Sequence, residues 1–188
     1  MGNELGEYLE WRDEKELGWN LLTYPIHDSL HEYVKALHKL YLEQPALYKS
    51  DYNSTSFRWI DADNKNQCIY AYRRSDPSGK TLYMVFNFSG SYQNYSLKVE
   101  QNGAYKELLN SDRDIYSGSN CINSGLYTTN YKLPLRLAPL SSVIITTEWE
   151  KNIKNHKILL QNGEICVIIW VYVIYNIYTK IIWEELCK

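Results

Sequence analysis

The chain of 188 residues carries 20 basic and 22 acidic side chains, so its formal net charge at pH 7 is only −2. This length allows one compact domain with an appendage and a core of useful size. No long run of either charge is present, so we expect neither a nucleic-acid partner nor an anionic membrane partner. The 18 Tyr and 6 Trp residues suit sandwich cores and sugar sites alike, so their number does not choose between these roles.

The composition of the first residues leads us to expect no secretory signal there. Glu4, Glu7 and Glu10 occupy the positions where a basic region and an apolar region would be needed. The cysteines lie in unrelated segments without a C-x-x-C spacing, which indicates free thiols rather than a disulfide framework. These cysteines are Cys68, Cys121, Cys166 and Cys187. We therefore expect a cytoplasmic protein.

One amphipathic helix is expected between residues 28 and 43, after a structured loop. Its apolar side chains recur at spacings of three and four and form one stripe. The stripe comprises Leu30, Tyr33, Val34, Leu37, Leu40 and Tyr41. Asp28 is the expected N-cap, and Pro45 is expected to stop the helix. Residues 45–48 then suit one further helical turn.

From residue 50 onward the apolar period changes to two, which is typical of strands. Turn residues such as Asp76-Pro77-Ser78-Gly79 separate the expected strands. These strands are 57–60, 68–73, 81–88, 95–99, 105–109, a stretch near 127–137, and 142–147. Short strands at this spacing predict an antiparallel β-sandwich.

The last segment breaks this pattern. Residues 151–188 contain 9 Ile, whereas residues 1–150 contain only 7. The run 165–175 is apolar or aromatic throughout, but it is too short to span a bilayer, so a membrane span is not favoured. The bias toward Ile, Asn, Tyr and Lys is what AT-rich DNA encodes in an unselected frame. We therefore expect an unrelated tail produced by a frameshift or read-through, and an intact long frame with the same tail would contradict this.

A series of short motifs runs from the first residue to about residue 148. The segment Met1–Glu7, with Glu10-Trp11 and Leu17-Gly18-Trp19, opens the series. It continues with Leu21–His27, Tyr33-Val34, Leu40-Tyr41, Pro45–Tyr48, Phe57–Asp61, Tyr72–Arg74, Val85–Phe88, Leu109–Asp112, Tyr116–Ser119 and Leu137–Leu140. In this order the motifs resemble the end of α-glucan branching enzymes, which belong to the α-amylase superfamily, glycoside hydrolase family thirteen. Ser56 replaces a Gly of the family pattern, and Ala138 replaces a Pro.

The resemblance implies a fold and a division of the chain. Residues 1–48 correspond to the last loop and helix of a catalytic (β/α)8 barrel, and residues 49–148 correspond to an all-β C-terminal domain. Residues 149–188 form the unrelated tail. The expected fold class is therefore mainly β, an antiparallel β-sandwich preceded by the end of a barrel.

The resemblance also implies the chemistry. Such enzymes cleave an α-1,4-glucan chain through a covalent glucosyl-enzyme intermediate and transfer it to a 6-hydroxyl, which makes a branch. The carboxylates that do this follow barrel strands four, five and seven in the family, so no catalytic residue is carried over. We expect the chain to be inactive alone, with no cofactor and no metal ion. The expected partners are an α-glucan, bound through the parent enzyme, and the missing barrel portion in trans.

The loop after the eighth barrel strand faces the cleft in such enzymes. The resemblance thus makes Glu4, Glu7, Trp11 and Trp19 candidates for lining the substrate cleft. A solvated acidic loop is the alternative for the two carboxylates, and packing is an equal alternative for the two indoles. A different function remains open as well, a stand-alone α-glucan-binding β-sandwich whose exposed rings stack on sugars.

Three histidines lie on the expected helix or just before it. His27 and His31 are four residues apart, and His38 follows one to two turns later. Zinc would need a third ligand in a suitable position, and none is evident. We therefore interpret these histidines as surface or loop residues.

Overall fold

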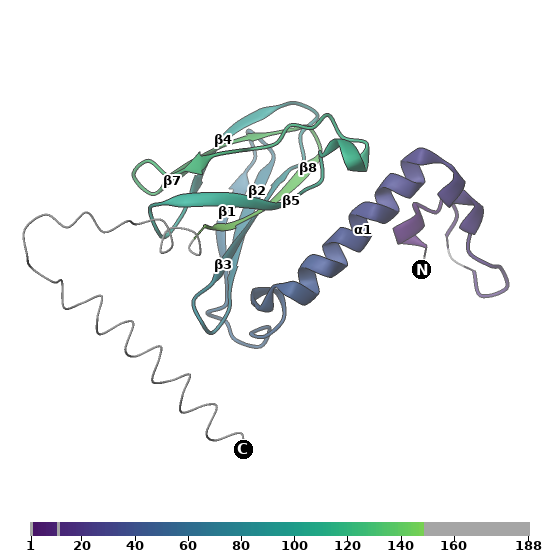
Figure 1. Ribbon diagram of the computed structural model, residues 1–188, viewed down its shortest axis with the longest axis horizontal. Helices are drawn as coiled ribbons and strands as arrows, with labels where there is room; N and C mark the ends of the chain where they lie inside the picture. The colour runs from purple at the N-terminus through teal and green to yellow at the C-terminus, as the bar shows by residue number, and fades with distance from the viewer. Residues whose placement is uncertain (1, 11, 149–188) are drawn as a thin grey trace, which may run out of the picture. The chain divides into compact units, whose positions relative to one another are not determined.

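The computed structural model describes residues 2–10 and 12–148. The expectations for Trp11 and for the tail at residues 149–188 lie outside these residues. Within them, a loop with two short 3-10 helices leads into one long helix, α1 (Pro25–Glu43), and then into strands. Figure 1 shows this order from the N-terminal loop through α1 to the β region.

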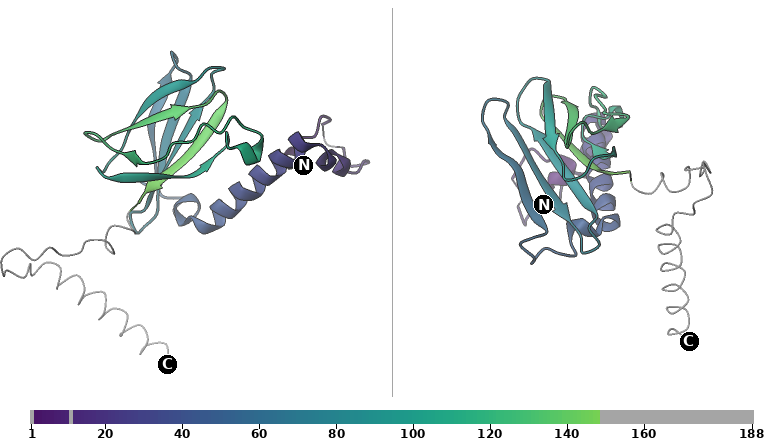
Figure 2. Two further views of the ribbon diagram at one scale, coloured as in Figure 1. Left: turned by 45° about the horizontal axis from the view of Figure 1, so that its top comes forward. Right: turned by 90° about the vertical axis from the view of Figure 1, so that its left-hand side faces the viewer.

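The strands of the described residues form two antiparallel sheets. They are β1 (Phe57–Asn64), β2 (Ile69–Ser75), β3 (Thr81–Asn87), β4 (Gln93–Lys98), β5 (Ala104–Asn110), β6 (Leu126–Tyr127), β7 (Lys132–Leu137) and β8 (Ser141–Thr147). The larger sheet has the order β1-β2-β3-β8-β5-β6, and β4 pairs with β7 in the smaller one. Figure 2 shows the β4 and β7 pair lying over one face of the larger sheet. The expected antiparallel sandwich is confirmed.

The main core lies between the two sheets. Along β7, Leu133, Leu135 and Leu137 are buried while the residues between them are exposed, as a half-buried strand requires. These leucines pack in one cluster with Leu97 of β4 and Val85 of β3. The period of two in the sequence therefore points the apolar side chains of both sheets into a shared interior.

The stretch expected near residues 127–137 is two strands rather than one. Asn130 and Tyr131 have φ values of 51° and 59°, so the chain turns sharply between β6 and β7. Thr129 and Lys132 close this turn with backbone hydrogen bonds of 2.9 and 3.1 Å. Two successive residues with positive φ suit a tight hairpin. The prediction missed the turn because Tyr131 is not a typical turn residue.

Helix α1 begins earlier than expected. Its first residue is Pro25 and its N-cap is Tyr24, so the prediction of Asp28 as N-cap is wrong. Proline is favoured at the first helical position because its φ is already helical and its missing N–H is not needed there. Asp28 lies in the first turn instead. The helix ends at Glu43, as expected, and a 3-10 turn follows at Pro45–Leu47.

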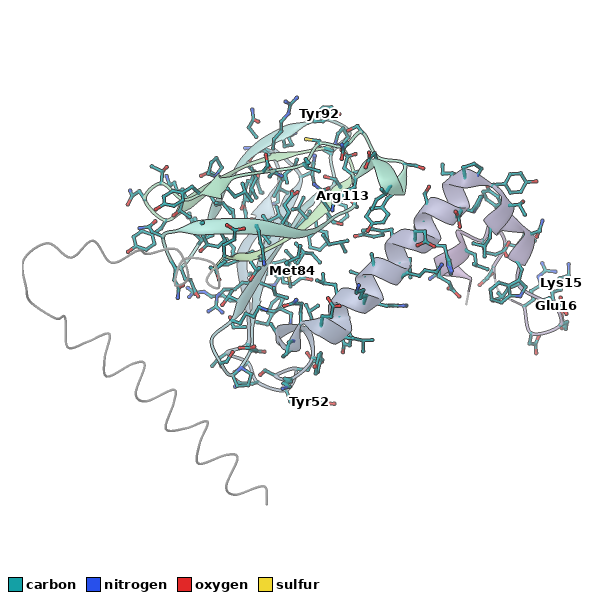
Figure 3. The ribbon with its side chains drawn as sticks, viewed as in Figure 1. Lys15, Glu16, Tyr52, Met84, Tyr92 and Arg113 are labelled. Atoms are coloured by element: carbon teal, nitrogen blue, oxygen red, sulfur yellow. The ribbon has the colours of Figure 1, made fainter. Side chains whose placement is uncertain are left out.

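One side of α1 packs on the face of the larger sheet that lies away from β4 and β7. Tyr33, Leu37 and Leu40 belong there to a second apolar cluster, which includes Met84 of β3 (Figure 3). The Tyr33 hydroxyl also lies 2.9 Å from the Ser142 hydroxyl of β8. The predicted stripe is wider than the sheet can cover, because Leu30 and Tyr41 remain partly exposed.

Candidate functional site

The candidate cleft loop begins with a short 3-10 helix, Asn3–Leu5, between two glycines in left-handed conformation. Gly2 has a φ of 91° and Gly6 a φ of 66°. The Gly2 carbonyl accepts hydrogen bonds from the amides of Leu5 and Glu7 at 3.0 and 3.2 Å. Leu5 is fully buried. The start of the loop is therefore a compact turn around one apolar anchor.

His27 holds this turn from the first turns of α1. Its side chain is only 7% exposed, so the prediction of a surface or loop role is wrong for this histidine. Its Nδ1 lies 2.8 Å from the Leu5 carbonyl oxygen, and its Nε2 lies 3.0 Å from the Tyr8 hydroxyl. These two contacts allow the ring to be buried, because a buried imidazole needs a hydrogen-bond partner for each of its nitrogens.

His31 extends the same contact one turn further along the helix. Its Nδ1 lies 3.3 Å from the carbonyl oxygen of Glu4. Glu4 itself is half-buried, and its backbone is thus tied to α1. The two histidines that a zinc motif would use are therefore joined to the loop backbone. Among the described residues, no group of three or more His, Cys, Asp or Glu side chains is placed to hold a metal ion.

Glu7 closes the loop on its return. Its Oε2 accepts a hydrogen bond of 2.8 Å from the amide of Gly18. A Cβ atom at Gly18 would lie 2.6 Å from the same oxygen, so glycine allows the approach. One oxygen of this candidate cleft carboxylate is therefore occupied within the loop.

A hollow of about 170 Å³ lies inside the loop beside Glu7. The described residues around it are Glu7, Leu9, Glu10, Arg12, Lys15, Glu16, Leu17 and Gly18. Figure 3 shows Lys15 and Glu16 together at the tip of the loop. Neither Glu4 nor Trp19 is among the described residues of the hollow. Trp19 is 58% exposed and immediately follows Gly18, while Trp11 lies outside the described residues.

Aromatic rings form a second feature, which the sequence reasoning did not single out. Six rings on β1, β2 and β3 and just beyond β3 lie edge to face, tilted or stacked, with neighbouring centroids 5.2 to 6.0 Å apart. We call them the aromatic ladder: Phe57, Trp59, Tyr70, Tyr72, Phe86 and Phe88. Tyr72 and Phe86 also pack against the cluster beneath α1, so the ladder continues that face of the sheet. Spacing of two between aromatic residues on three successive strands was the signal that could have found it.

A larger hollow of about 560 Å³ lies at another place in the β region. Its lining includes Lys80 at the start of β3, Lys106 on β5 and Thr147 at the end of β8. None of its residues belongs to the candidate loop. As for the membrane, no helix among residues 2–10 and 12–148 is long and apolar enough to cross a bilayer.

Comparison with known proteins finds a matching family model and similar branching enzymes. Residues 59–148 match the family model of the alpha amylase C-terminal all-beta domain. The chain is 35% identical over 161 residues to the 1,4-alpha-glucan branching enzyme GlgB of Oceanobacillus iheyensis, across 80% of this chain and 25% of that protein. It is 40% identical over 125 residues to the GlgB of Bacillus cytotoxicus, across 65% of this chain and 19% of that protein.

Among solved structures, the α-amylase from H. orenii is similar over 64% of this chain and 21% of that chain, with 19% identity and a TM-score of 0.45. The chain spans about a quarter or less of the length of the two curated relatives described above.

Proposed function

Because residues 59–148 form an alpha-amylase C-terminal all-β domain and the chain belongs to the 1,4-α-glucan branching enzyme family, we propose that it supplies the C-terminal part of such an enzyme. The complete enzyme transfers an α-1,4-glucan segment to a 6-hydroxyl and acts in glycogen biosynthesis. Its substrate is an α-glucan such as glycogen or amylose, and its location is the cytoplasm. This chain carries none of the residues that we assign to catalysis, so it is inactive by itself.

The proposed division of the chain follows the resemblance. Residues 1–48 contribute the last loop and helix of the catalytic barrel, residues 49–148 contribute the all-β domain, and residues 149–188 form an unrelated tail. The observation that carries this proposal is the exposure of large apolar side chains at the two ends of α1. Ile26 is 70% and Leu42 is 74% exposed, on a helix that packs Tyr33, Leu37 and Leu40 against the sheet. Ile26 lies in the first turn and Leu42 in the last, about 160° apart around the helix axis. A barrel portion packed around both ends of the helix would cover them.

The assay for this proposal measures α-1,6 linkages formed in amylose. We expect none from the purified chain alone, and branching when the chain is mixed with the barrel portion of a related enzyme that lacks its own C-terminal part. Branches formed by the chain alone would contradict the proposal.

A matched pair of variants tests the surface. Leu42→Asp places a charge on the exposed side of α1 and should abolish the complementation. Leu140→Asp is the control, because Leu140 is equally exposed at 75% but lies in the turn between β7 and β8. Its φ of 50° suits Asp. Equal loss of complementation in both variants would argue against docking through α1.

The aromatic ladder favours a second candidate function, an α-glucan-binding β-sandwich. Trp59 is 51% exposed and lies 5.6 Å from Tyr72 between ring centroids. Exposed rings in a row offer apolar faces on which sugar rings can stack, and the hydroxyl of a tyrosine adds a polar contact. In this reading the sandwich holds a glucan chain whether or not a barrel is present.

Affinity electrophoresis in glycogen gels tests the second function. We expect glycogen to retard the chain and Trp59→Ala to restore most of its mobility. Tyr127→Ala is the control, since Tyr127 is also exposed but lies on β6 at the opposite edge of the larger sheet. Unretarded migration of the unmodified chain would exclude autonomous binding.

A further inference from the structure

We infer that His27 is the positioning residue of the cleft-facing loop and fixes the backbone of Leu5 to Tyr8 from α1. The inference rests on the proposed function only for what the loop faces, namely an α-glucan. The contact itself spans 22 residues between Leu5 and His27 and 19 between Tyr8 and His27. His27 thus connects the helix to the loop at two points, and His31 adds a longer contact at Glu4.

The partners of His27 determine which of its nitrogens carries the proton. The Leu5 carbonyl oxygen can only accept, so Nδ1 carries a hydrogen and donates it across 2.8 Å. In the neutral ring Nε2 is then an acceptor, and the Tyr8 hydroxyl donates to it across 3.0 Å. The loop therefore selects the Nδ1–H tautomer of a buried imidazole, and both ring nitrogens are used.

Packing around the ring makes the contact specific to this loop conformation. A Cβ at Gly6 would lie 3.0 Å from His27 Nδ1 and 3.1 Å from Leu30, and its φ of 66° already favours glycine. The ring of Tyr8 meets the imidazole edge to face, with centroids 5.2 Å apart. These contacts therefore favour a single conformation of Leu5, Gly6 and Tyr8 against the helix.

The consequence concerns the two candidate cleft carboxylates. Glu4 precedes Leu5 and is tied to His31, whereas Glu7 lies between Gly6 and Tyr8 and binds the Gly18 amide. The Glu4 backbone and the Glu7 carboxylate are thus placed by contacts within the described part of residues 2–31. The edge of the cleft that these two residues would form is therefore positioned by α1 at Glu4 and by the return of the loop at Gly18 for Glu7.

Hydrogen exchange on the full 188-residue chain tests the inference. His27→Leu keeps an apolar side chain but removes both nitrogens, and we expect exchange at the amides of Leu5, Glu7 and Gly18 to rise about tenfold or more. His27→Asn retains a donor near the position of Nδ1 and should restore part of the protection. His38→Leu, an exposed position on the same helix, is the matched control and should change nothing.

Two readouts separate positioning from general unfolding. Amides of β3 should exchange at unchanged rates in every variant, and nitrogen NMR of the unmodified chain should find His27 in the Nδ1–H tautomer. Loop exchange within about twofold of the unmodified chain in His27→Leu, or an Nε2–H tautomer, would overturn the inference.

Maltoheptaose provides the arm that tests the proposed function separately. Added to the chain together with the barrel portion, it should slow exchange in residues 2–10, and His27→Leu should weaken this protection. No effect of maltoheptaose, with the His27 effect on exchange still present, would remove the glucan role and leave the positioning role intact.

Discussion

The β-sandwich and the region of loop and helix before it differ in how completely the described chain buries them. In the sandwich, Leu97 and Leu133 from the small sheet and Ile69 from the large one are fully buried. In the helical region, Ile26 and Leu42 are mostly exposed at the two ends of α1. The difference teaches that the two sheets close the interior of the sandwich by themselves, whereas α1 presents a surface that suits a partner.

Polar contacts show the same contrast. Asn87 of β3 is 1% exposed and its amide bonds to the carbonyl oxygens of Ser91 and Ala138 at 2.9 and 2.7 Å, while its own oxygen accepts from Ser89. One buried amide therefore holds two loops of the sandwich. The N-terminal loop depends instead on the contacts of His27 and Glu7, which join it to α1 and to its own return segment.

The largest expected effect comes from removing core volume in the sandwich. Leu133→Ala should lower the free energy of unfolding by about 2–5 kcal/mol, because it leaves a cavity in a fully buried site. Leu42→Ala, the same substitution on the exposed side of α1, should change it by less than about 0.5 kcal/mol. Urea titration monitored by circular dichroism measures both. Similar losses in the two variants would mean that α1 is as well packed as the sandwich.

A somewhat smaller effect is expected from Asn87→Ala. It removes the hydrogen bonds that connect the loop after β3 to the loop before β8, and it leaves the Ala138 carbonyl oxygen with only the Ser141 hydroxyl as a donor. We expect a loss of about 2–3 kcal/mol, which the same urea titration measures. Asn94→Ala is the control, since Asn94 is an exposed residue of β4. A loss below about 1 kcal/mol for Asn87→Ala would show that water replaces its contacts.

Gly18→Ala should act on the loop alone. The new Cβ would lie 2.6 Å from Glu7 Oε2, so the carboxylate must move and its bond to the Gly18 amide is lost. Because the φ of Gly18 is −73°, the backbone itself is not strained by alanine. We expect about tenfold faster exchange at the residue 18 amide, with the urea midpoint of the sandwich unchanged.

Gly90→Ala is the control for Gly18→Ala, because a Cβ at Gly90 meets nothing within 4 Å. An unchanged exchange rate in Gly18→Ala would show that Glu7 does not hold the return of the loop.

The sandwich was predictable from the sequence for a local reason. The alternation of polar and apolar residues in segments such as Lys132–Leu137 can be recognised from neighbouring residues alone. The end of α1 before Pro45 is a local signal of the same kind. The start of α1 was misplaced because Asp28 looked like a cap, although Pro25 already fits the first helical position. Local signals therefore fixed the kind of element better than its first residue.

The loop contacts were not predictable in this way. His27 is buried because of Leu5 and Tyr8, which are 22 and 19 residues away, so no spacing within the helix reveals it. Glu7 was selected through a family resemblance, and the Gly18 amide bond was not foreseen. The cleft-lining roles of Glu4, Glu7, Trp11 and Trp19 stay predictions, because they depend on a surface that only a partner or a glucan would complete.

The smallest expected effect concerns acid and the turn between β2 and β3. Asp76 Oδ1 accepts hydrogen bonds from the Ser78 amide and hydroxyl and from the Lys80 amide, at 2.8, 2.6 and 3.0 Å. Partial burial raises the pKa of Asp76, but these bonds and the charge of Lys80 outweigh it, so the net pKa lies below its ordinary value of 3.8. A lowered pKa in the folded state stabilises the fold above pH 3.8, and this stabilisation is lost as the pH falls through the folded value.

On the acid side of about pH 4, the free energy of unfolding should therefore fall less in Asp76→Asn than in the unmodified chain. The difference should be about 0.5 kcal/mol or less, because the carboxylate is largely solvated. Thermal melts between about pH 2.5 and 6 measure it. Asp13→Asn removes the same charge from the exposed N-terminal loop and is the control. Parallel curves of unfolding free energy against pH for Asp76→Asn and the unmodified chain would contradict this. They would mean that the Asp76 carboxylate contributes no more to stability than the Asp13 carboxylate does. Acid sensitivity would then no longer distinguish the two regions.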